Sequence, residues 1–169
     1  MAAAGLTLTG ATKQDVAALV ALQTATAERL TAGYGDGHWS HLPTERGVLR
    51  SMRESRVLVA RDAADKIVAT LRLTTKKPWA IDRSYFTAVK TPLYLLDMAV
   101  DVLVQRQGIG RRCMDDAARI AREWPADAIR LDAYDAAAGA GEFYAKCGYQ
   151  PRGRFTYRLV PLLYYELLL

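Results

Sequence analysis

The sequence predicts an α/β fold with a central sheet of about six or seven strands, mixed but mostly antiparallel, and flanked by helices. Strand patterns are paired early in the chain, strands and helices then alternate, and two further strand patterns follow. A strand–helix–strand order needs a crossover and so predicts one parallel pair, formed by residues 93–100 and 128–134. The chain of 169 residues, 51% of them hydrophobic, suffices for one buried core, so we expect one domain over residues 1–169.

The first third of the chain predicts a short strand and two helices. The strand is expected at residues 6–9, before a helix that a capping box at Thr12 opens and Gly33 ends. Residues 34–41 are rich in turn formers and predict a loop. Pro43 suits the first turn of the second helix, because proline lacks the N–H that an interior turn requires.

The remaining elements follow from alternation, apolar runs and helical periodicity. Residues 57–61 and 66–74 form a predicted β-hairpin, and residues 76–92, which lack a clear period, predict an irregular connection and a candidate lid. The later elements are a strand at 93–100, a helix at 108–124, a strand at 128–134, a helix to Lys146 before Gly148, and final strands at 149–155 and 157–168.

Composition limits the partners. A net charge of +5 and a pI near 9.3 suit an anionic ligand, and scattered basic residues disfavour nucleic acid. No apolar stretch approaches the roughly 18 residues that span a membrane, and residues 1–5 lack the basic start of an export signal. We therefore expect a cytoplasmic protein without a membrane partner, in which Cys113 and Cys147 are buried thiols rather than a disulfide.

A turn between a predicted strand and helix carries the strongest functional signal. Its residues are Gln105, Arg106, Gln107, Gly108, Ile109, Gly110 and Arg111. Free N–H groups and the positive end of the helix dipole converge where such a turn enters a helix. The two glycines remove side chains where a pyrophosphate approaches the backbone, and the two arginines add positive charge. The turn therefore predicts an anion site.

Two alternatives compete for this turn. In a dinucleotide site, Asp132 would be the acidic residue about 20 positions further on that binds a ribose. Cys113 stands where the third glycine of that motif belongs, and residues 101–107 separate the strand from the glycines. In the other alternative, the glycines only make a tight turn from strand to helix.

The spacing Q-x-x-G-x-G at residues 105–110 resembles motif A of the GNAT N-acetyltransferases. Residues 131–135 and 142–149, a strand followed by a helix ending in Y-x-K-x-G-Y, resemble the second half of that family's signature. The resemblance covers residues 57–155 closely. It implies the acyl-CoA N-acyltransferase fold, acetyl-CoA as co-substrate and no metal. It also implies acetyl transfer to a primary amine of a small molecule or peptide by direct attack in a ternary complex, in a monomer or homodimer.

The resemblance also assigns roles to residues near the predicted sheet. Tyr144 matches the tyrosine that donates a proton to the departing thiolate. The backbone of Met98, Ala99 and Val100 falls where the family's strand pairs with the pantetheine arm and polarises the acetyl carbonyl. Asp132 and Asp97 are the candidate general bases. In the alternative for each, Asp132 pairs with Arg130 on the same strand face, and Asp97 accepts hydrogen bonds from loop N–H groups.

Two positions depart from the family pattern. Tyr94 stands where some members carry a catalytic glutamate, which favours a water-relayed base. Ala137 stands where many members carry a cofactor-binding asparagine, so contact there would come from backbone or apolar surface. A non-catalytic acyl-CoA-binding or regulatory module is therefore an alternative function.

Loop residues supply candidates for acceptor binding. Trp39 and Tyr85 are expected to contact the substrate, although aromatic loop residues can equally pack on a core. His38 and His41 lack the helical register and third ligand of a metal site, so no metal is expected. The apolar residues 162–165 and 167–169 are a candidate edge strand for a dimer contact.

Overall fold

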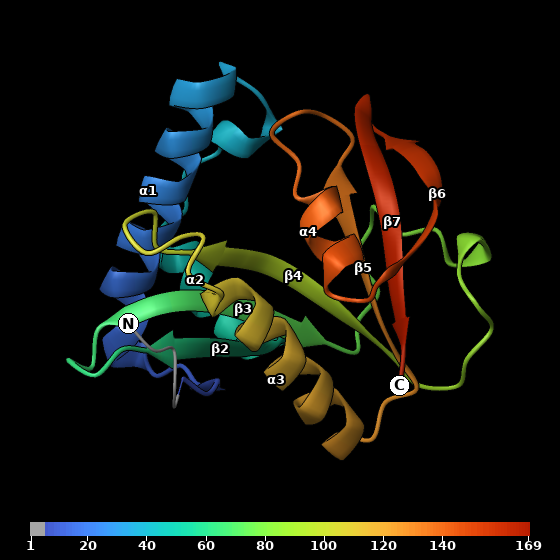
Figure 1. Cartoon of the computed structure of the whole chain (residues 1–169), viewed down its shortest axis with the longest axis horizontal. Coiled ribbons are helices and arrows are strands. Elements are labelled where there is room, and N and C mark those ends of the chain that lie inside the picture. Colours follow the sequence, from blue (N-terminus) through green and yellow to red (C-terminus); the bar gives the residue numbers. More distant parts are fainter. Residues whose placement is uncertain (1–5) are drawn as a thin grey trace. The chain divides into compact units, whose positions relative to one another are not determined.

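The computed structural model describes residues 6–169 (Figure 1). Its seven strands form one sheet in the order β1-β2-β3-β4-β5-β7-β6. The strands are β1 (Thr9–Gly10), β2 (Arg56–Arg61), β3 (Ile67–Thr74), β4 (Pro92–Val100), β5 (Ala128–Tyr134), β6 (Gln150–Tyr157) and β7 (Val160–Leu168). The pair β4/β5 is parallel, and the pairs β1/β2, β2/β3, β5/β7 and β6/β7 are antiparallel. The predicted mixed, mostly antiparallel sheet is confirmed.

The described residues also form four α-helices. They are α1 (Val16–Tyr34), α2 (Glu45–Glu54), α3 (Ile109–Glu123) and α4 (Gly141–Lys146), with short 3-10 helices η1 (Lys13–Asp15), η2 (His38–Ser40) and η3 (Arg83–Tyr85). Among residues 6–169, no helix combines the length and apolar character that crossing a bilayer requires. The expectation about an export signal concerns residues 1–5, which lie outside the described residues.

The chain divides into two compact units. The first contains the described residues up to Leu73 together with residues 96–117, and the second contains residues 74–95 and 118–169. Each unit has its own core and its own candidate functional residues. The expectation of one domain over residues 1–169 stays a prediction.

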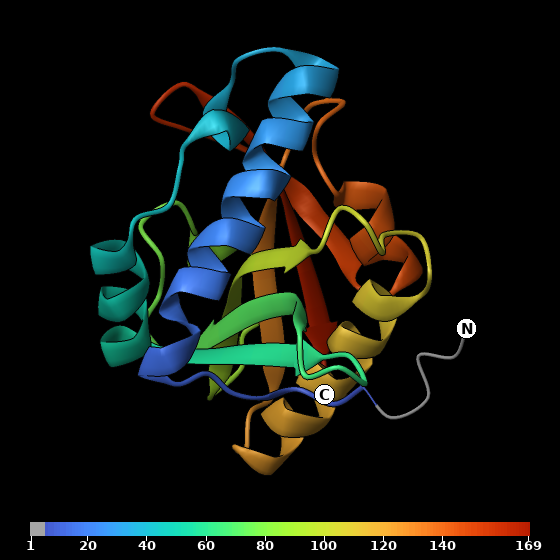
Figure 2. The same cartoon turned by 90° about the vertical axis from the view of Figure 1, so that its left-hand side faces the viewer.

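A hydrophobic cluster joins α1 and α2 to the strands of the first unit. Its buried members are Val16, Leu19, Leu22, Val48, Val59, Ile67 and Ala99. Figure 2 shows α1 lying over strands of this unit, as the shared cluster requires. In the β2/β3 hairpin, Leu58 lies opposite Leu71 and Ala60 lies opposite Ala69. Residues two apart in a strand point to the same side, so both pairs lie on one face of the hairpin. The predicted β-hairpin is confirmed.

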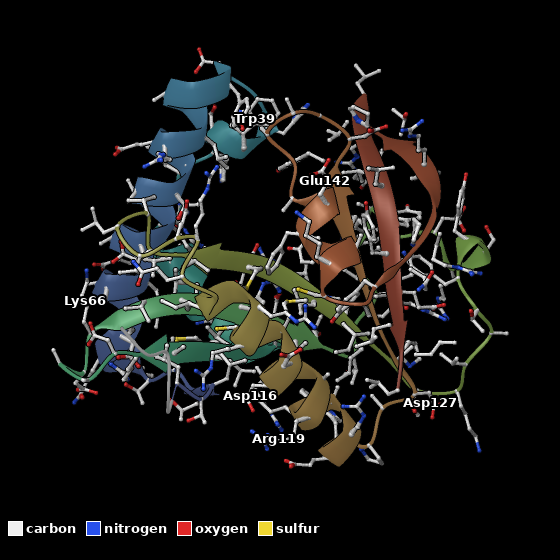
Figure 3. The ribbon with its side chains drawn as sticks, viewed as in Figure 1. Trp39, Lys66, Asp116, Arg119, Asp127 and Glu142 are labelled. Carbon is white, nitrogen blue, oxygen red and sulfur yellow. The ribbon has the colours of Figure 1, made fainter. Side chains whose placement is uncertain are left out.

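The first strand differs from its prediction. The Leu8 N–H, which a strand at residues 6–9 would donate to a neighbouring strand, is instead 2.6 Å from Oδ2 of Asp116 on α3 (Figure 3). A carboxylate is a stronger acceptor than a backbone carbonyl. Pairing with β2 is therefore limited to Thr9 and Gly10.

Two helix boundaries also differ. The first helix continues through Gly33 and ends at Gly35, whose φ of 79° lies in the left-handed region that glycine adopts without strain. The second helix begins after Pro43, because Thr44 is its N-cap and accepts the Gly47 N–H through its side chain at 3.0 Å. The capping threonine, rather than the proline, sets this helix start.

The second unit contains the parallel pair and the final hairpin. Pro92 lies opposite Ala128 and Tyr94 opposite Arg130 in the parallel pair, as predicted. Strand β7 pairs with β5 along one side and with β6 along the other. Its backbone groups are used on both sides, so the expectation that the segment 162–169 is a free edge strand for dimerisation is wrong.

Candidate functional site

The segment between β4 and α3, in the first unit, is the predicted anion loop. The helix begins at Ile109, and its first hydrogen bond joins the Arg112 N–H to the Gly108 carbonyl at 3.2 Å. The N–H groups of the three residues before Arg112 therefore have no acceptor within the helix. They sit at the positive end of the dipole of a 15-residue helix, where an anion is stabilised.

Backbone conformation explains the glycine at position 108. Gly108 has a φ of 81°, which side chains other than glycine rarely adopt, and Arg106 in the same loop has a φ of 62°. A Cβ added at Gly108 would meet no atom within 4 Å. The glycine is thus required by conformation, and the open space beside it leaves the backbone accessible to a ligand.

The polar side chains of the loop divide into two groups. Gln105 donates from its Nε2 to the Val100 carbonyl at 3.1 Å, so its side chain holds the loop to the end of β4. Arg106 is exposed, and Arg111 forms a pair at 3.4 Å with Asp115 in which both side chains are more than half exposed. Exposed pairs of this kind contribute little stability, so the guanidinium can exchange partners.

Asp97 marks a break in the conformation of β4. Its φ of 55° lies in the left-handed region, which aspartate tolerates better than most residues. Its carboxylate is 2.5 Å from Nε of Arg72, on β3, and is half exposed. The Asp97 carboxylate therefore accepts a hydrogen bond from the Arg72 guanidinium, and this bond does not exclude others from loop N–H groups. Met98, Ala99 and Val100 complete the strand before the anion loop.

Tyr144 lies in the second unit, on the short helix α4, and is 8% exposed. Its ring packs at 5.3 Å from Phe143, 6.2 Å from Tyr149 and 6.1 Å from Tyr165. The predicted end of this helix is confirmed, because Gly148 has a φ of 90° and donates its N–H to the Ala145 carbonyl. An aromatic cluster thus fixes the ring of the proposed acid.

Asp132 is partly buried on β5, directly opposite Tyr164 on β7. Opposite residues of an antiparallel pair point to the same face. Burial raises the pKa of the Tyr164 phenol to about 12, and the negative charge of Asp132 contributes to that rise. In the alternative for Asp132 its partner is Arg130, whose guanidinium is bonded to Glu166 and to the Thr87 carbonyl; this alternative stays a prediction.

Arg130 forms a buried ion pair with Glu166, and their side chains are only 4% and 2% exposed. The Arg130 Nε donates to Oε2 of Glu166 at 3.0 Å, and Nη2 donates to the Thr87 carbonyl at 2.5 Å. The Thr87 N–H completes the network by donating to Oε1 of Glu166 at 3.1 Å. The guanidinium also lies 5.0 Å from the ring centre of Phe86, a favourable cation–π distance.

The connection predicted at residues 76–92 is irregular, as expected, but it is anchored at several backbone atoms. The Tyr164 hydroxyl accepts the Asp82 N–H at 3.1 Å and donates to the Ala80 carbonyl. Arg152 donates to the Tyr85 carbonyl at 3.1 Å. The pair of Arg130 and Glu166 bonds both the carbonyl and the N–H of Thr87. Side chains from β5, β6 and β7 thus satisfy its backbone, so we expect a fixed segment rather than a mobile lid.

The two aromatic residues predicted to contact substrate pack against protein. The Tyr85 ring lies edge-on to Phe155 and Tyr164 at 5.8 and 5.3 Å. Trp39 donates its indole N–H to the Gly35 carbonyl at 2.9 Å, and its ring occupies the place where a Cβ on Gly37 would stand. Both rings are half-buried, so part of each surface faces solvent.

Neither the histidines nor the cysteines form a recognisable reactive group. Among residues 6–169, no set of three or more His, Cys, Asp or Glu side chains is arranged to hold a metal ion. Cys113 and Cys147 are buried free thiols, as predicted. Burial raises the pKa of Cys113 to about 11, which disfavours the thiolate that a nucleophile requires.

The sheet and the anion loop define a class: an α/β protein with a mixed sheet in which a glycine-containing loop leads from a strand into a helix. The dinucleotide alternative requires a doubly wound parallel sheet, whereas the pairs β1/β2, β2/β3, β5/β7 and β6/β7 of this sheet are antiparallel. The acetyltransferase (GNAT) domain family matches residues 53–151, more than half of the chain. The chain belongs to the GNAT acetyltransferase family.

Solved structures share the fold across nearly the whole chain. A GNAT-family acetyltransferase from Listeria monocytogenes has a TM-score of 0.76 at 18% identity, covering 100% of this chain and 99% of its own. A ribosomal-protein-alanine N-acetyltransferase from Brucella melitensis has a TM-score of 0.70 at 18% identity, covering 96% and 99%. An N-acetyltransferase from Staphylococcus aureus has a TM-score of 0.69 at 14% identity, covering 98% and 99%. No curated protein matches the sequence.

Proposed function

We propose that this protein transfers the acetyl group of acetyl-CoA to a primary amine. The observation that supports this most directly is the loop at residues 105–111 in a chain of the GNAT family: the N–H groups at its helix start have no acceptor within the helix, and a Cβ added at Gly108 would meet no atom within 4 Å. The loop would bind the cofactor's pyrophosphate through these N–H groups, with Arg106 and Arg111 adding charge. The backbone of residues 98–100 would pair with the pantetheine arm.

The chemical step joins the amine nitrogen to the acetyl carbon and breaks the bond from that carbon to sulfur. The amine must lose a proton, and the departing thiolate must gain one. Tyr144 is the proposed donor to the thiolate. Asp132, or Asp97 through a water, is the proposed acceptor of the amine proton. Direct attack in a ternary complex needs no covalent enzyme intermediate, which agrees with the buried state of both cysteines.

The acceptor is proposed to be a small molecule or a peptide that carries a cationic amine. Structural neighbours include a ribosomal-protein-alanine N-acetyltransferase and an aminoglycoside 6'-acetyltransferase, so proteins of this fold act on both kinds of acceptor. The carboxylates of Asp132 and Asp97 favour a cation. A cytoplasmic location and a monomer or homodimer remain part of this proposal.

Calorimetric titration with acetyl-CoA, CoA and NADH tests the cofactor. We expect the CoA compounds to bind and NADH not to bind, and Gly108→Glu to abolish binding by placing a carboxylate at the phosphates. Gly35→Glu is a matched control, because Gly35 has a φ of 79° and also meets no atom within 4 Å of an added Cβ. Equal losses in both variants, or selective NADH binding by the wild type, would overturn the cofactor assignment.

A second experiment separates the enzyme from a non-catalytic acyl-CoA-binding module. Tyr144→Phe removes the proposed proton donor and keeps the ring that packs in the aromatic cluster. We expect a loss of roughly 10²–10⁴-fold in kcat with unchanged acetyl-CoA affinity. Turnover that is absent in the wild type over a broad amine screen would favour the binding module.

A further inference from the structure

A lysine outside the predicted cofactor loop is bonded to the first residue of the segment between β4 and α3. Asp101 follows the last residue of β4, and its Oδ2 accepts a hydrogen bond from Lys66 Nζ at 2.7 Å. Lys66 directly precedes β3, at the end of the β2/β3 hairpin turn. The Asp101 carboxylate is only 13% exposed, whereas the Lys66 side chain is 57% exposed. A mostly buried acid is therefore neutralised by a lysine that still reaches solvent. Figure 3 labels Lys66.

Asp101 organises the first half of this segment. Its N–H donates to the Val68 carbonyl at 2.8 Å, its carbonyl accepts the Val104 N–H at 3.0 Å, and its Oδ1 accepts the Leu103 N–H at 2.9 Å. The hydrogen bond from Lys66 lowers the pKa of the Asp101 carboxyl, so the acid is ionised at neutral pH. The segment after β4 thus begins with a fixed negative charge, whereas its second half is suited to bind an anionic ligand.

The start of the proposed cofactor loop, residues 105–111, lies beside the backbone of Asp101. The side chain of Gln105 donates to the Val100 carbonyl, which belongs to the same peptide unit as the Asp101 N–H. The side chain of Gln105, the first residue of the loop 105–111, therefore lies beside the backbone of Asp101. Without a counter-charge, the Asp101 carboxylate would repel a pyrophosphate bound by this loop.

We propose that Lys66 is a positioning residue for cofactor binding, which cancels the charge of Asp101 and so keeps the loop receptive to the cofactor's phosphates. The inference rests on the proposed function, because it concerns the same loop. Lys66 acts through Asp101 and need not touch the cofactor. Its removal should weaken binding by about 3- to 10-fold at about 0.1 M salt, and less at higher salt, because repulsion between partly exposed charges is screened.

The test is a double-mutant cycle with CoA as the titrant in calorimetry. Lys66→Met should raise the Kd, and Lys66→Arg, which keeps the charge, should restore it. Asp101→Asn removes the repelling charge and can still accept the Leu103 N–H, so Lys66→Met combined with Asp101→Asn should return to within about 2-fold of wild type. Lys13→Met, an exposed lysine of the same unit, is the matched control for loss of one positive charge.

The outcomes separate charge cancellation from a purely structural tie. If Lys66 only tied the loop to the sheet, the double variant would bind as weakly as Lys66→Met, and this result would overturn the inference. An unchanged Kd in Lys66→Met would also overturn it. A wild type that binds no CoA would instead refute the proposed function. Melting temperatures confirm folding, and Lys66→Gln replaces Lys66→Met in the cycle if the methionine variant does not fold.

Discussion

Replacing Glu166 by glutamine measures the cost of leaving Arg130 buried without its counter-charge. Glu166 and Arg130 are bonded at 3.0 Å, and their side chains are 2% and 4% exposed. Glutamine keeps the size of the side chain and removes its charge. The guanidinium of Arg130 would then stay in a site that excludes water, without its counter-charge.

The expected loss follows from what remains bonded. Removing one partner of a buried pair costs about 3–5 kcal/mol. We expect the lower limit, about 3 kcal/mol, because the Thr87 carbonyl still accepts from Arg130 and the glutamine oxygen can still accept the Thr87 N–H. For a chain of this size, about 2–4 °C per kcal/mol gives a melting temperature about 6–12 °C lower.

Glu54→Gln provides an exposed control with the same distance between the charged atoms. Arg50 Nε lies 3.0 Å from Glu54 Oε1, the same atom types and distance, but these side chains are 70% and 43% exposed. We expect less than about 0.5 kcal/mol there. Urea and thermal unfolding followed by circular dichroism measure both variants. Similar losses in the two, or a loss below about 1 kcal/mol for Glu166→Gln, would refute the argument that burial sets the size of the effect.

Three further predictions concern single side chains. Tyr164→Phe removes the hydroxyl that accepts the Asp82 N–H, so we expect about 1–3 kcal/mol lower stability and faster amide exchange at Asp82. Burial opposes ionisation of Asp15, but hydrogen bonds from a backbone N–H and from Arg61 leave its pKa lowered. Its contribution to stability should be present above about pH 4, so the difference between wild type and Asp15→Asn should shrink as the pH falls below about 4 in urea titrations. Cys113, with a pKa of about 11, should react with a thiol reagent at pH 8 more than about 100-fold slower in the native than in the unfolded chain.

Local patterns in the sequence predicted most elements of the fold. Alternation at residues 57–74 and the apolar run at 93–100 depend on short-range periodicity, which the sheet preserves. The anion loop was predictable because glycine at position 108 reports a backbone conformation, a φ of 81°, rather than a tertiary contact. Such features need only neighbouring residues to be interpreted.

Features that depend on distant partners were not predictable. Thr87 and Glu166 are 79 residues apart, and nothing local in the irregular segment indicates that a buried pair holds it. The charged residues Arg130 and Glu166 in otherwise apolar strands were the one available signal. Likewise, the local sequence predicts a strand at Leu8, but its N–H is bonded to the Asp116 carboxylate, 108 positions away. The placement of β7 between β5 and β6 also needs long-range pairing.

The position of β7 has a consequence for synthesis on the ribosome. β7 follows both of its neighbours in the sequence and is the strand to which each of them is bonded. When residues up to Tyr157 have emerged, β6 therefore has no strand of its own unit to pair with, and one side of β5 is still unpaired. A nascent chain halted there would expose both edges to other chains, so completion of this sheet must wait for residues 160–168.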